Sequence, residues 1–148
     1  MKRSVLFVCT GNICRSPTAE GVLRSIAGKE NVDLRVESRG THDYHVGEPP
    51  DERSQRHALK RGYDLSAQRA KQVSKRDFRE FDLIVAMDRG HLGLLKRMCP
   101  PALLGKLRLF ENEVPDPYYG GPDGFERVLD LLEAGCRNLL AELKATSL

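Results

Sequence analysis

Several features are scarce in this chain of 148 residues, and each absence excludes a class of protein. The chain contains no tryptophan, and its formal net charge is only +3. It has no dense run of Lys and Arg interleaved with aromatic residues, so the sequence does not predict a nucleic-acid-binding surface. The basic residues between Arg53 and Arg79 are interrupted by acidic and turn residues, which is typical of a solvated face.

Long hydrophobic runs are also missing. No segment approaches the roughly 20 apolar residues of a membrane-spanning helix. The apolar part of the opening MKRSVLFV is too short for a secretory signal and runs into Gly11 and Asn12. We therefore expect a cytoplasmic protein, in which the four cysteines are catalytic or core thiols rather than disulfides. Because no repeat, low-complexity tract or linker is visible, residues 1–148 are expected to form a single domain.

The apolar residues that are present alternate between strand-like runs and helix-like spacing. Strands are expected over residues 4–9, 34–38, 81–87 and 107–110. Helices are expected from Ser16 to about Gly28, over 51–61 up to Gly62, from Asp88 to Pro100, and along a closing apolar stripe from Phe125 to Leu143. This alternation predicts an α/β fold with a parallel sheet flanked by helices on both faces. Ligands of such folds bind beyond the carboxyl ends of the strands.

The stretch VCTGNICRSPTAE, residues 8–20, places two cysteines and an arginine between the first strand and the first helix. Four residues separate Cys9 from Cys14, whereas a thioredoxin-like pair has two. No further ligand follows at a zinc-site spacing, and the four histidines form no pattern with the cysteines: His42, His45, His57 and His91. The stretch also lacks the lysine of a nucleotide-binding P-loop. The sequence therefore predicts neither a metal nor a cofactor.

A phosphate-binding loop that contains a nucleophile fits the stretch better. Backbone N–H groups between a strand end and a helix start can surround a tetrahedral oxyanion. The residues that would form this loop are Thr10, Gly11, Asn12, Ile13 and Cys14. Arg15 would add a planar fork for two anion oxygens, and the same positive field would favour the thiolate of Cys9.

Three small residues fit the geometry of such a loop. Gly11 permits a positive φ and a close backbone approach, and Asn12 tolerates the left-handed conformation. Ser16 is expected to cap the following helix and to donate a hydrogen bond to the Cys9 sulfur.

A thiolate that attacks a phosphate ester needs a general acid for the departing oxygen. Asp116 is the candidate, because Pro115 and Pro117 restrict the backbone on either side of it. Tyr118 and Tyr119 would form aromatic walls next to the acid. A surface turn would also contain such residues, but this loop follows a strand whose end is expected to share the rim with Cys9.

These motifs resemble the low-molecular-weight protein tyrosine phosphatases over nearly the whole chain. The likeness rests on VLFVCTGNICRSPTAE, SRGTHDYHVG, RAKQV, Met87-Asp88 and DPYYG. It implies a four-stranded parallel sheet, with the phosphate loop between the first strand and the first helix. It implies Cys9 as nucleophile, Arg15 as phosphate clamp and Asp116 as acid and then base, without a metal. Asn12 and Ser16 would shape the loop and tune the thiolate, and Tyr44 would line the aryl groove with Tyr118 and Tyr119.

Neighbouring activities on the same scaffold are alternatives. Arsenate reductases resemble the loop but relay oxidation through two further cysteines, for which Cys99 is the only candidate in its region. Arginine phosphatases also resemble it but carry a small polar residue where Ile13 stands. A non-catalytic phosphotyrosine-binding module would be expected to lack Cys9 or Asp116.

The expected partners are phosphotyrosine-containing proteins, with a tyrosine kinase as one candidate, and a phosphate or other oxyanion in the loop. We also expect redox regulation: a reversible disulfide between Cys9 and Cys14 would protect the nucleophile from over-oxidation. A buried small thiol is the alternative for Cys14.

Overall fold

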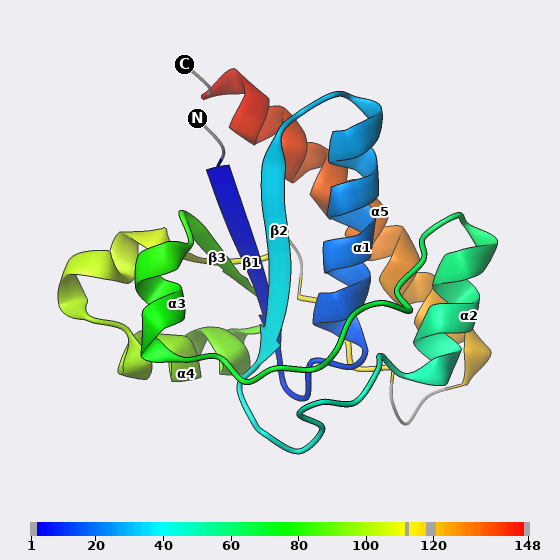
Figure 1. Ribbon diagram of the computed structural model, residues 1–148, viewed down its shortest axis with the longest axis horizontal. Coiled ribbons are helices and arrows are strands. Elements are labelled where there is room, and N and C mark those ends of the chain that lie inside the picture. Colours follow the sequence, from blue (N-terminus) through cyan, green and yellow to red (C-terminus); the bar gives the residue numbers. More distant parts are fainter. Residues whose placement is uncertain (1–2, 112, 118–120, 147–148) are drawn as a thin grey trace.

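The computed structural model describes residues 3–111, 113–117 and 121–146 (Figure 1). Four parallel strands form one sheet in the order β2-β1-β3-β4. The strands are β1 (Arg3–Cys9), β2 (Leu34–Gly40), β3 (Leu83–Ala86) and β4 (Leu107–Leu109). Helices cover both faces of this sheet, so the predicted α/β class and its parallel four-stranded sheet are confirmed.

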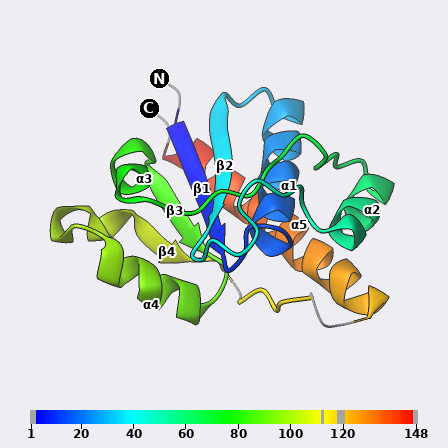
Figure 2. The same cartoon turned by 60° about the horizontal axis from the view of Figure 1, so that its bottom comes forward.

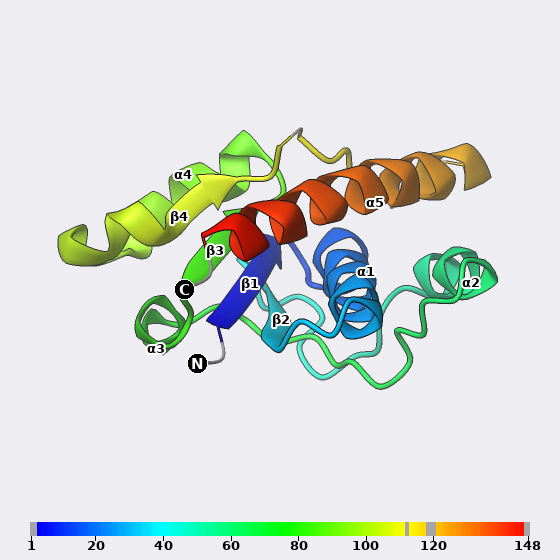
Figure 3. The ribbon, with the colours of Figure 1, turned by 90° about the horizontal axis from the view of Figure 1, so that it is seen from above.

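The first strand is apolar throughout because both of its faces are covered. Val5, Phe7 and Cys9 belong to the core beneath α1 (Arg15–Lys29) and α5 (Pro122–Ala145), which lie next to each other in Figure 3. Leu6 and Val8 point the other way, into the core beneath α3 (Lys75–Glu80) and α4 (Arg89–Met98). Side chains of a strand alternate between its two faces, so one continuous apolar run serves two cores.

One more helix and a 3-10 helix lie among the described residues. Helix α2 (Glu52–Lys60) packs beside α5, and the 3-10 helix η1 (Pro101–Lys106) leads from α4 into β4. The glycine expected to end α2, Gly62, has φ +91°, a conformation that favours glycine. Among the helices that the structure describes, none combines the length and apolarity needed to cross a bilayer.

Several predicted element boundaries were wrong. Residues 81–87 were expected as strand, but β3 spans Leu83–Ala86 and Phe81 is the residue that ends α3. The six-residue helix α3 was not predicted, although Ser74 and Asp77 provide a start signal: the Ser74 N–H donates to Asp77 at 2.9 Å. Helix α1 continues past Gly28 to Lys29.

The carboxyl ends of all four strands lie on one rim, where the connecting loops gather (Figure 2). The segment after β4 is held there by backbone hydrogen bonds from Phe110 N–H to Ala86 O at 2.9 Å and from Val114 N–H to Met87 O at 2.8 Å. The Phe110 ring packs against α5 where Gly135 leaves room, since a Cβ at position 135 would lie 2.1 Å from the ring. This rim carries the candidate site.

Candidate active site

Residues 10–14 connect β1 to α1 as a tight loop. Asn12 has φ 58°, so the expected left-handed residue is present. Gly11 does not have the positive φ that was expected; the described glycines with positive φ are Gly47 and Gly62. Gly11 is needed for space instead, because a Cβ there would lie 2.9 Å from the His45 ring.

Behind the loop, a chain of hydrogen bonds leads to the sulfur of Cys9. The Asn12 amide donates to Ser16 Oγ at 2.8 Å and to Ser38 Oγ at 2.9 Å. Its own oxygen accepts from the Lys71 backbone N–H at 2.9 Å, which fixes the orientation of the amide. Since Ser16 Oγ already accepts from Asn12, its proton is available to Cys9 Sγ, 2.9 Å away.

Ser16 does not cap the helix as expected. Helix α1 begins at Arg15, its N-cap is Cys14, and no side chain caps it. The physical reason is that the Ser16 hydroxyl lies within the first turn and bonds Cys9 and Asn12. The other predicted role of Ser16, as a neighbour of the Cys9 sulfur, agrees with the observed contact.

Arg15 is buried at 5% exposure, and both ends of its guanidinium have acceptors. Nη1 donates to Asp88 Oδ2 at 2.9 Å and to the Val114 carbonyl oxygen at 3.0 Å. Nη2 lies 3.4 Å from Thr10 Oγ1 and 3.7 Å from Asp116 Oδ2. Arg15 is therefore fixed on its Nη1 side, while Nη2 faces the candidate nucleophile loop and the candidate acid.

His91, at the start of α4, stands behind this arginine. Its Nε2 is 2.7 Å from Thr10 Oγ1 and 3.4 Å from Arg15 Nη2, and the residue is only 4% exposed. Burial, together with the positive charge of Arg15, lowers the pKa of His91 to about 4, so the ring is neutral at pH 7. Since Nε2 faces an arginine, a neutral ring accepts there, which makes Nδ1 the protonated nitrogen.

Asp88 joins Arg15 to α4. Its Oδ1 accepts from the His91 backbone N–H at 2.9 Å, so the expected cap at Asp88 is present. Burial opposes ionisation of this carboxyl and raises its pKa. The bond from the His91 backbone N–H, the charge that the His91 ring gains only at acidic pH and the guanidinium of Arg15 outweigh burial, so the Asp88 pKa lies below its ordinary value.

A cavity of about 270 Å³ opens above the loop. The residues that line it are Cys9, Thr10, Gly11, Ile13, Cys14, Arg15, Tyr44, His45 and Asp116. Tyr44 is 67% exposed and stacks on the His42 ring with centroids 4.9 Å apart, so it forms an outer wall. Asn12 and Ser16 do not line the cavity but support the loop from behind. The predicted walls Tyr118 and Tyr119 lie outside the described residues.

Cys14 differs from Cys9 in its surroundings. Burial, strengthened by the negative charge of Asp51, raises the pKa of the Cys14 thiol to about 12. A thiol of that kind is protonated and unreactive at pH 7. All four cysteines are free thiols in the structure. Among the residues that the structure describes, no three His, Cys, Asp or Glu side chains gather as a metal site would require.

Four contributors to the site were not predicted as site residues: Asp88 beyond its capping role, His91, the Val114 carbonyl and His45. Of these, only Asp88 could have been recognised from the sequence, because it directly follows a buried strand. The other three come from separate elements and reach the site only through the packing of those elements.

The chain is similar to known proteins along nearly its whole length. A family model described as low molecular weight phosphotyrosine protein phosphatase matches residues 4–147. The chain is 39% identical over 151 residues to the low molecular weight protein-tyrosine-phosphatase YfkJ of Bacillus subtilis, covering 95% of this chain and 96% of the relative. It is 39% identical over 149 residues to the Homo sapiens low molecular weight phosphotyrosine protein phosphatase, with 93% and 94% covered.

A solved structure resembles the chain closely. It is a protein tyrosine phosphatase from Entamoeba histolytica with Hepes in the active site, 38% identical to this chain. The TM-score is 0.94, and 99% of each chain is covered. The likeness therefore extends to the whole fold and not only to the loop.

Proposed function

The chain belongs to the low molecular weight phosphotyrosine protein phosphatase family, and we propose that it hydrolyses phosphotyrosine in proteins through a phosphocysteine on Cys9. The observation that carries this proposal is the single cavity shared by three groups. They are the sulfur of Cys9, the guanidinium of Arg15 and the carboxyl of Asp116. Nucleophile, anion clamp and proton donor are the parts that such a reaction needs.

In the first step the Cys9 thiolate attacks phosphorus in line with the aryl oxygen. The S–P bond forms as the P–O bond breaks, and the leaving electron pair takes the proton of the Asp116 carboxyl to give a neutral phenol. Arg15 and the loop N–H groups hold the three equatorial oxygens, where negative charge is spread in the transition state. The Ser16 hydroxyl, 2.9 Å from the sulfur, stabilises the thiolate before attack.

In the second step water attacks the phosphocysteine. Asp116, now a carboxylate, takes a proton from that water, and the S–P bond breaks to return the thiolate and release inorganic phosphate. The same carboxyl thus serves first as acid and then as base. No other titratable group is required by this scheme.

The arrangement of the remaining cysteines disfavours arsenate reduction. Cys136 belongs to the core on one face of the sheet and Cys99 to the core on the other. A relay that starts at Cys9 would have to pass through the sheet to reach Cys99. Ile13, which lines the cavity and is 8% exposed, favours an aromatic ring over a charged guanidinium substrate.

The substrates we propose are phosphotyrosine-containing proteins, including a tyrosine kinase as one candidate, and the phosphate released would occupy the loop. We place the reaction in the cytoplasm, where thiols such as Cys9 stay reduced.

Hydrolysis of p-nitrophenyl phosphate tests the proposal. We expect turnover by the intact chain, none by Cys9→Ser, and a kcat lowered by about 10²- to 10⁴-fold in Asp116→Asn, because the acid is lost. Cys99→Ser is the matched control: this cysteine lies in the opposite core, so its removal should leave kcat unchanged. Absence of turnover by the intact chain, or full activity in Cys9→Ser, contradicts the proposal.

A further inference from the structure

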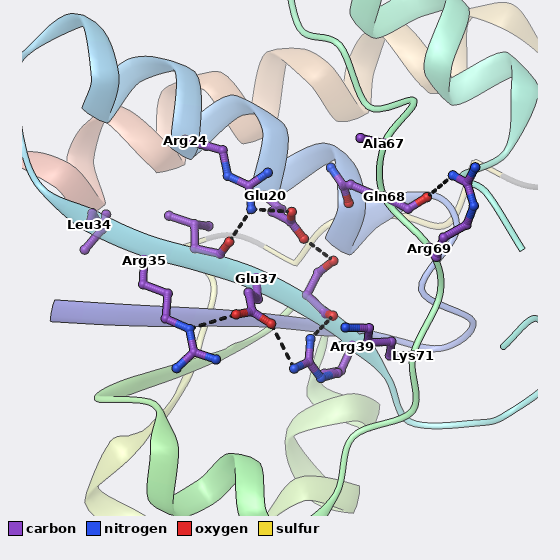
Figure 4. A pocket seen from close by; sticks show the side chains of 12 residues that line it. Glu20, Arg24, Leu34, Arg35, Glu37, Arg39, Ala67, Gln68, Arg69 and Lys71 are labelled. Atoms are coloured by element: carbon purple, nitrogen blue, oxygen red, sulfur yellow. Dashed lines mark hydrogen bonds and ion pairs between the residues drawn. The ribbon is translucent and has the colours of Figure 1, made fainter. Parts of the chain in front are cut away.

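A second and larger cavity lies along the outer edge of the sheet. Its volume is about 590 Å³, and it is bounded by β2, by α1 and by residues 67–71 (Figure 4). Most of its lining is polar, and five of the lining side chains are cations: Arg24, Arg35, Arg39, Arg69 and Lys71. The lining carboxylates are Glu20 and Glu37. A polar cavity of this size with surplus positive charge suits an anion rather than an apolar ligand.

Three of the cations are already paired. Arg24 contacts Glu20 at 2.7 Å, and Arg35 contacts Glu37 at 2.7 Å. Arg39 lies 2.9 Å from the same Glu37 and 3.4 Å from Asp77 of α3. Arg35 also lies 3.6 Å from Glu80 of α3. The two carboxylates that line the cavity are thus already paired with the three arginines of α1 and β2.

The other two cations lack a carboxylate. Arg69 donates to the carbonyl oxygens of Ser66 and Gln68, and among the described residues it forms no ion pair. Lys71 has no hydrogen bond or ion pair through its ammonium group to any residue that the structure describes. Its position is nevertheless fixed, because its backbone N–H is bonded to Asn12 and its carbonyl oxygen accepts from the Gly40 N–H at 2.8 Å.

Protection of the sheet edge explains part of this arrangement. Strand β2 is an edge strand, and arginine side chains cover two of its carbonyl oxygens: Arg24 donates to Val36 O at 2.6 Å and Arg39 to Ser38 O at 2.9 Å. Charged side chains there prevent pairing with another chain. The backbone around Lys71 pairs with the end of β2 at Gly40, but the side chains of Lys71 and Arg69 donate to no carbonyl oxygen of β2. Edge protection therefore does not account for these two cationic side chains.

The cavity shares a wall with the candidate active site. Ser38 lines the cavity and donates to Glu20 at 2.8 Å, while it accepts from Asn12 on the other side. Lys71 lines the cavity with its side chain and supports Asn12 with its backbone. An occupant of the cavity would therefore touch the residues that hold the Cys9 loop in shape.

We propose that this cavity is a second anion site, which binds a polyphosphate group through the side chains of Lys71 and Arg69. A chain of phosphates fits better than a single one, because the cations are spread along a cavity about twice as large as that at Cys9, 590 against 270 Å³. The polyphosphate can be free or can end a nucleotide. The proposal concerns binding alone and does not depend on phosphatase activity.

The test is a titration of the isotope-labelled full chain with inorganic tripolyphosphate, followed by amide NMR. We expect saturable shifts at residues 35–39 and 67–71, and we expect them to persist in Arg15→Ala, which weakens only the loop at Cys9. Lys71→Glu should weaken binding at the second site by about tenfold or more, since a charge-assisted contact becomes repulsive. Lys60→Glu on α2 is the matched control and should bind as the intact chain does.

A second variant and a second ligand complete the test. Lys71→Ala removes the positive charge without adding a negative one, and the dispersion of its amide NMR spectrum shows whether the variant is folded. A parallel titration with adenosine triphosphate separates the two sources, because tighter binding than tripolyphosphate indicates a nucleotide. The proposal is overturned if no saturable shift appears at 35–39 and 67–71 below about 10 mM ligand, a very weak affinity. Equal binding by the Lys71 and Lys60 variants would also overturn it. Since no turnover is measured, failure here leaves the proposed phosphatase activity untouched.

Discussion

The two cavities of this protein differ in size, charge and depth. The larger one, about 590 Å³, lies along the sheet edge and is lined by ion pairs between arginines and carboxylates. The smaller one, about 270 Å³, lies at the strand ends and brings a thiol, a buried guanidinium and a carboxyl together. Cavity size is therefore a poor guide to chemistry in this fold. What marks the smaller cavity is a thiol next to a buried guanidinium that Asp88 and the Val114 carbonyl hold in place. Fixing a buried charge beside a reactive group costs desolvation and is found where function needs it.

The largest expected effect contrasts one arginine from each cavity. Arg15→Lys should lower kcat/KM for p-nitrophenyl phosphate by about 10³-fold, because a point charge cannot replace the planar fork that binds two phosphate oxygens. Arg24→Lys should change it less than about threefold, since the Arg24 side chain is 55% exposed, lies outside the smaller cavity, and a lysine keeps the charge that pairs with Glu20. Steady-state kinetics of the two variants provide the comparison. Similar losses in both would mean that the cavities are not functionally distinct.

The wall between the cavities depends on Asn12. Asn12→Ala should lower the free energy of unfolding by about 3 kcal/mol, since it unpairs the buried Ser16, Ser38 and Lys71 groups and places alanine at positive φ. Asn31 has the same φ of 58° but is exposed, so Asn31→Ala isolates the backbone cost of about 1 kcal/mol. Urea unfolding measures both. If the two variants lose equal stability, the hydrogen bonds of Asn12 contribute nothing.

The buried histidine behind the smaller cavity should make stability depend on pH, unlike the arginines of the larger cavity, which stay charged over the same pH range. The folded-state pKa of His91 is lowered from 6.5 to about 4. The unfolded chain therefore binds the proton first as pH falls, and the stability His91 contributes is full above pH 6.5 and lost toward pH 4.

Between pH 7 and pH 5 this loss should amount to about 2 kcal/mol. His91→Asn removes the titrating group and should lose correspondingly less over the same interval in urea unfolding. Its kcat should fall modestly as well, because Asn can still accept from Arg15 or Thr10 but fills less space. A pH dependence identical to that of the intact chain would rule out the shifted histidine.

The last prediction concerns the two thiols of the smaller cavity. Peroxide converts the Cys9 thiolate to a sulfenic acid. The Cys14 thiolate then attacks that sulfur, and the S–S bond forms as the S–O bond breaks and hydroxide leaves, which solvent protonates to water. Because burial raises the pKa of Cys14 to about 12, the rate of the second step should rise about tenfold per pH unit between pH 7 and pH 9. Mass spectrometry of quenched samples follows the bond. Sulfonate at Cys9 with no bond to Cys14 at any pH would refute redox protection.

The sequence predicted the parts of the site that are local in the chain. The phosphate-loop interpretation of residues 9–15 was possible because the strand, the turn and the helix start are consecutive in the chain. Each residue type in that stretch also has a steric or electrostatic reason to occupy its position. Asp116 could be placed because parallel strands bring their carboxyl ends to one rim. The aromatic walls at Tyr118 and Tyr119 remain predictions.

The rest depended on packing between distant segments. His91 is an isolated histidine in the sequence, and only the approach of α4 to the loop places it against Thr10 and Arg15. The bond from Lys71 to Asn12 joins residues 59 apart and follows no sequence period. Helix α3 is too short to show helical periodicity. Ser16 was assigned to capping because its hydrogen bonds to Cys9 and Asn12 are tertiary, and a local pattern does not reveal them.

The attachment of the segment after β4 has a consequence for where substitutions can affect catalysis. Val114 is held at its N–H by Met87 and at its carbonyl by Arg15, just after Phe110 is fixed against Gly135. Asp116 therefore follows the fixed residue Val114 by only two positions, so their Cα atoms are at most about 7 Å apart. Pro115 restricts the backbone between them. The place where the chain brings Asp116 to the site is thus set by segments far from it in sequence, β3 and α5. A substitution at Met87 or Gly135 is therefore expected to alter catalysis without touching the substrate.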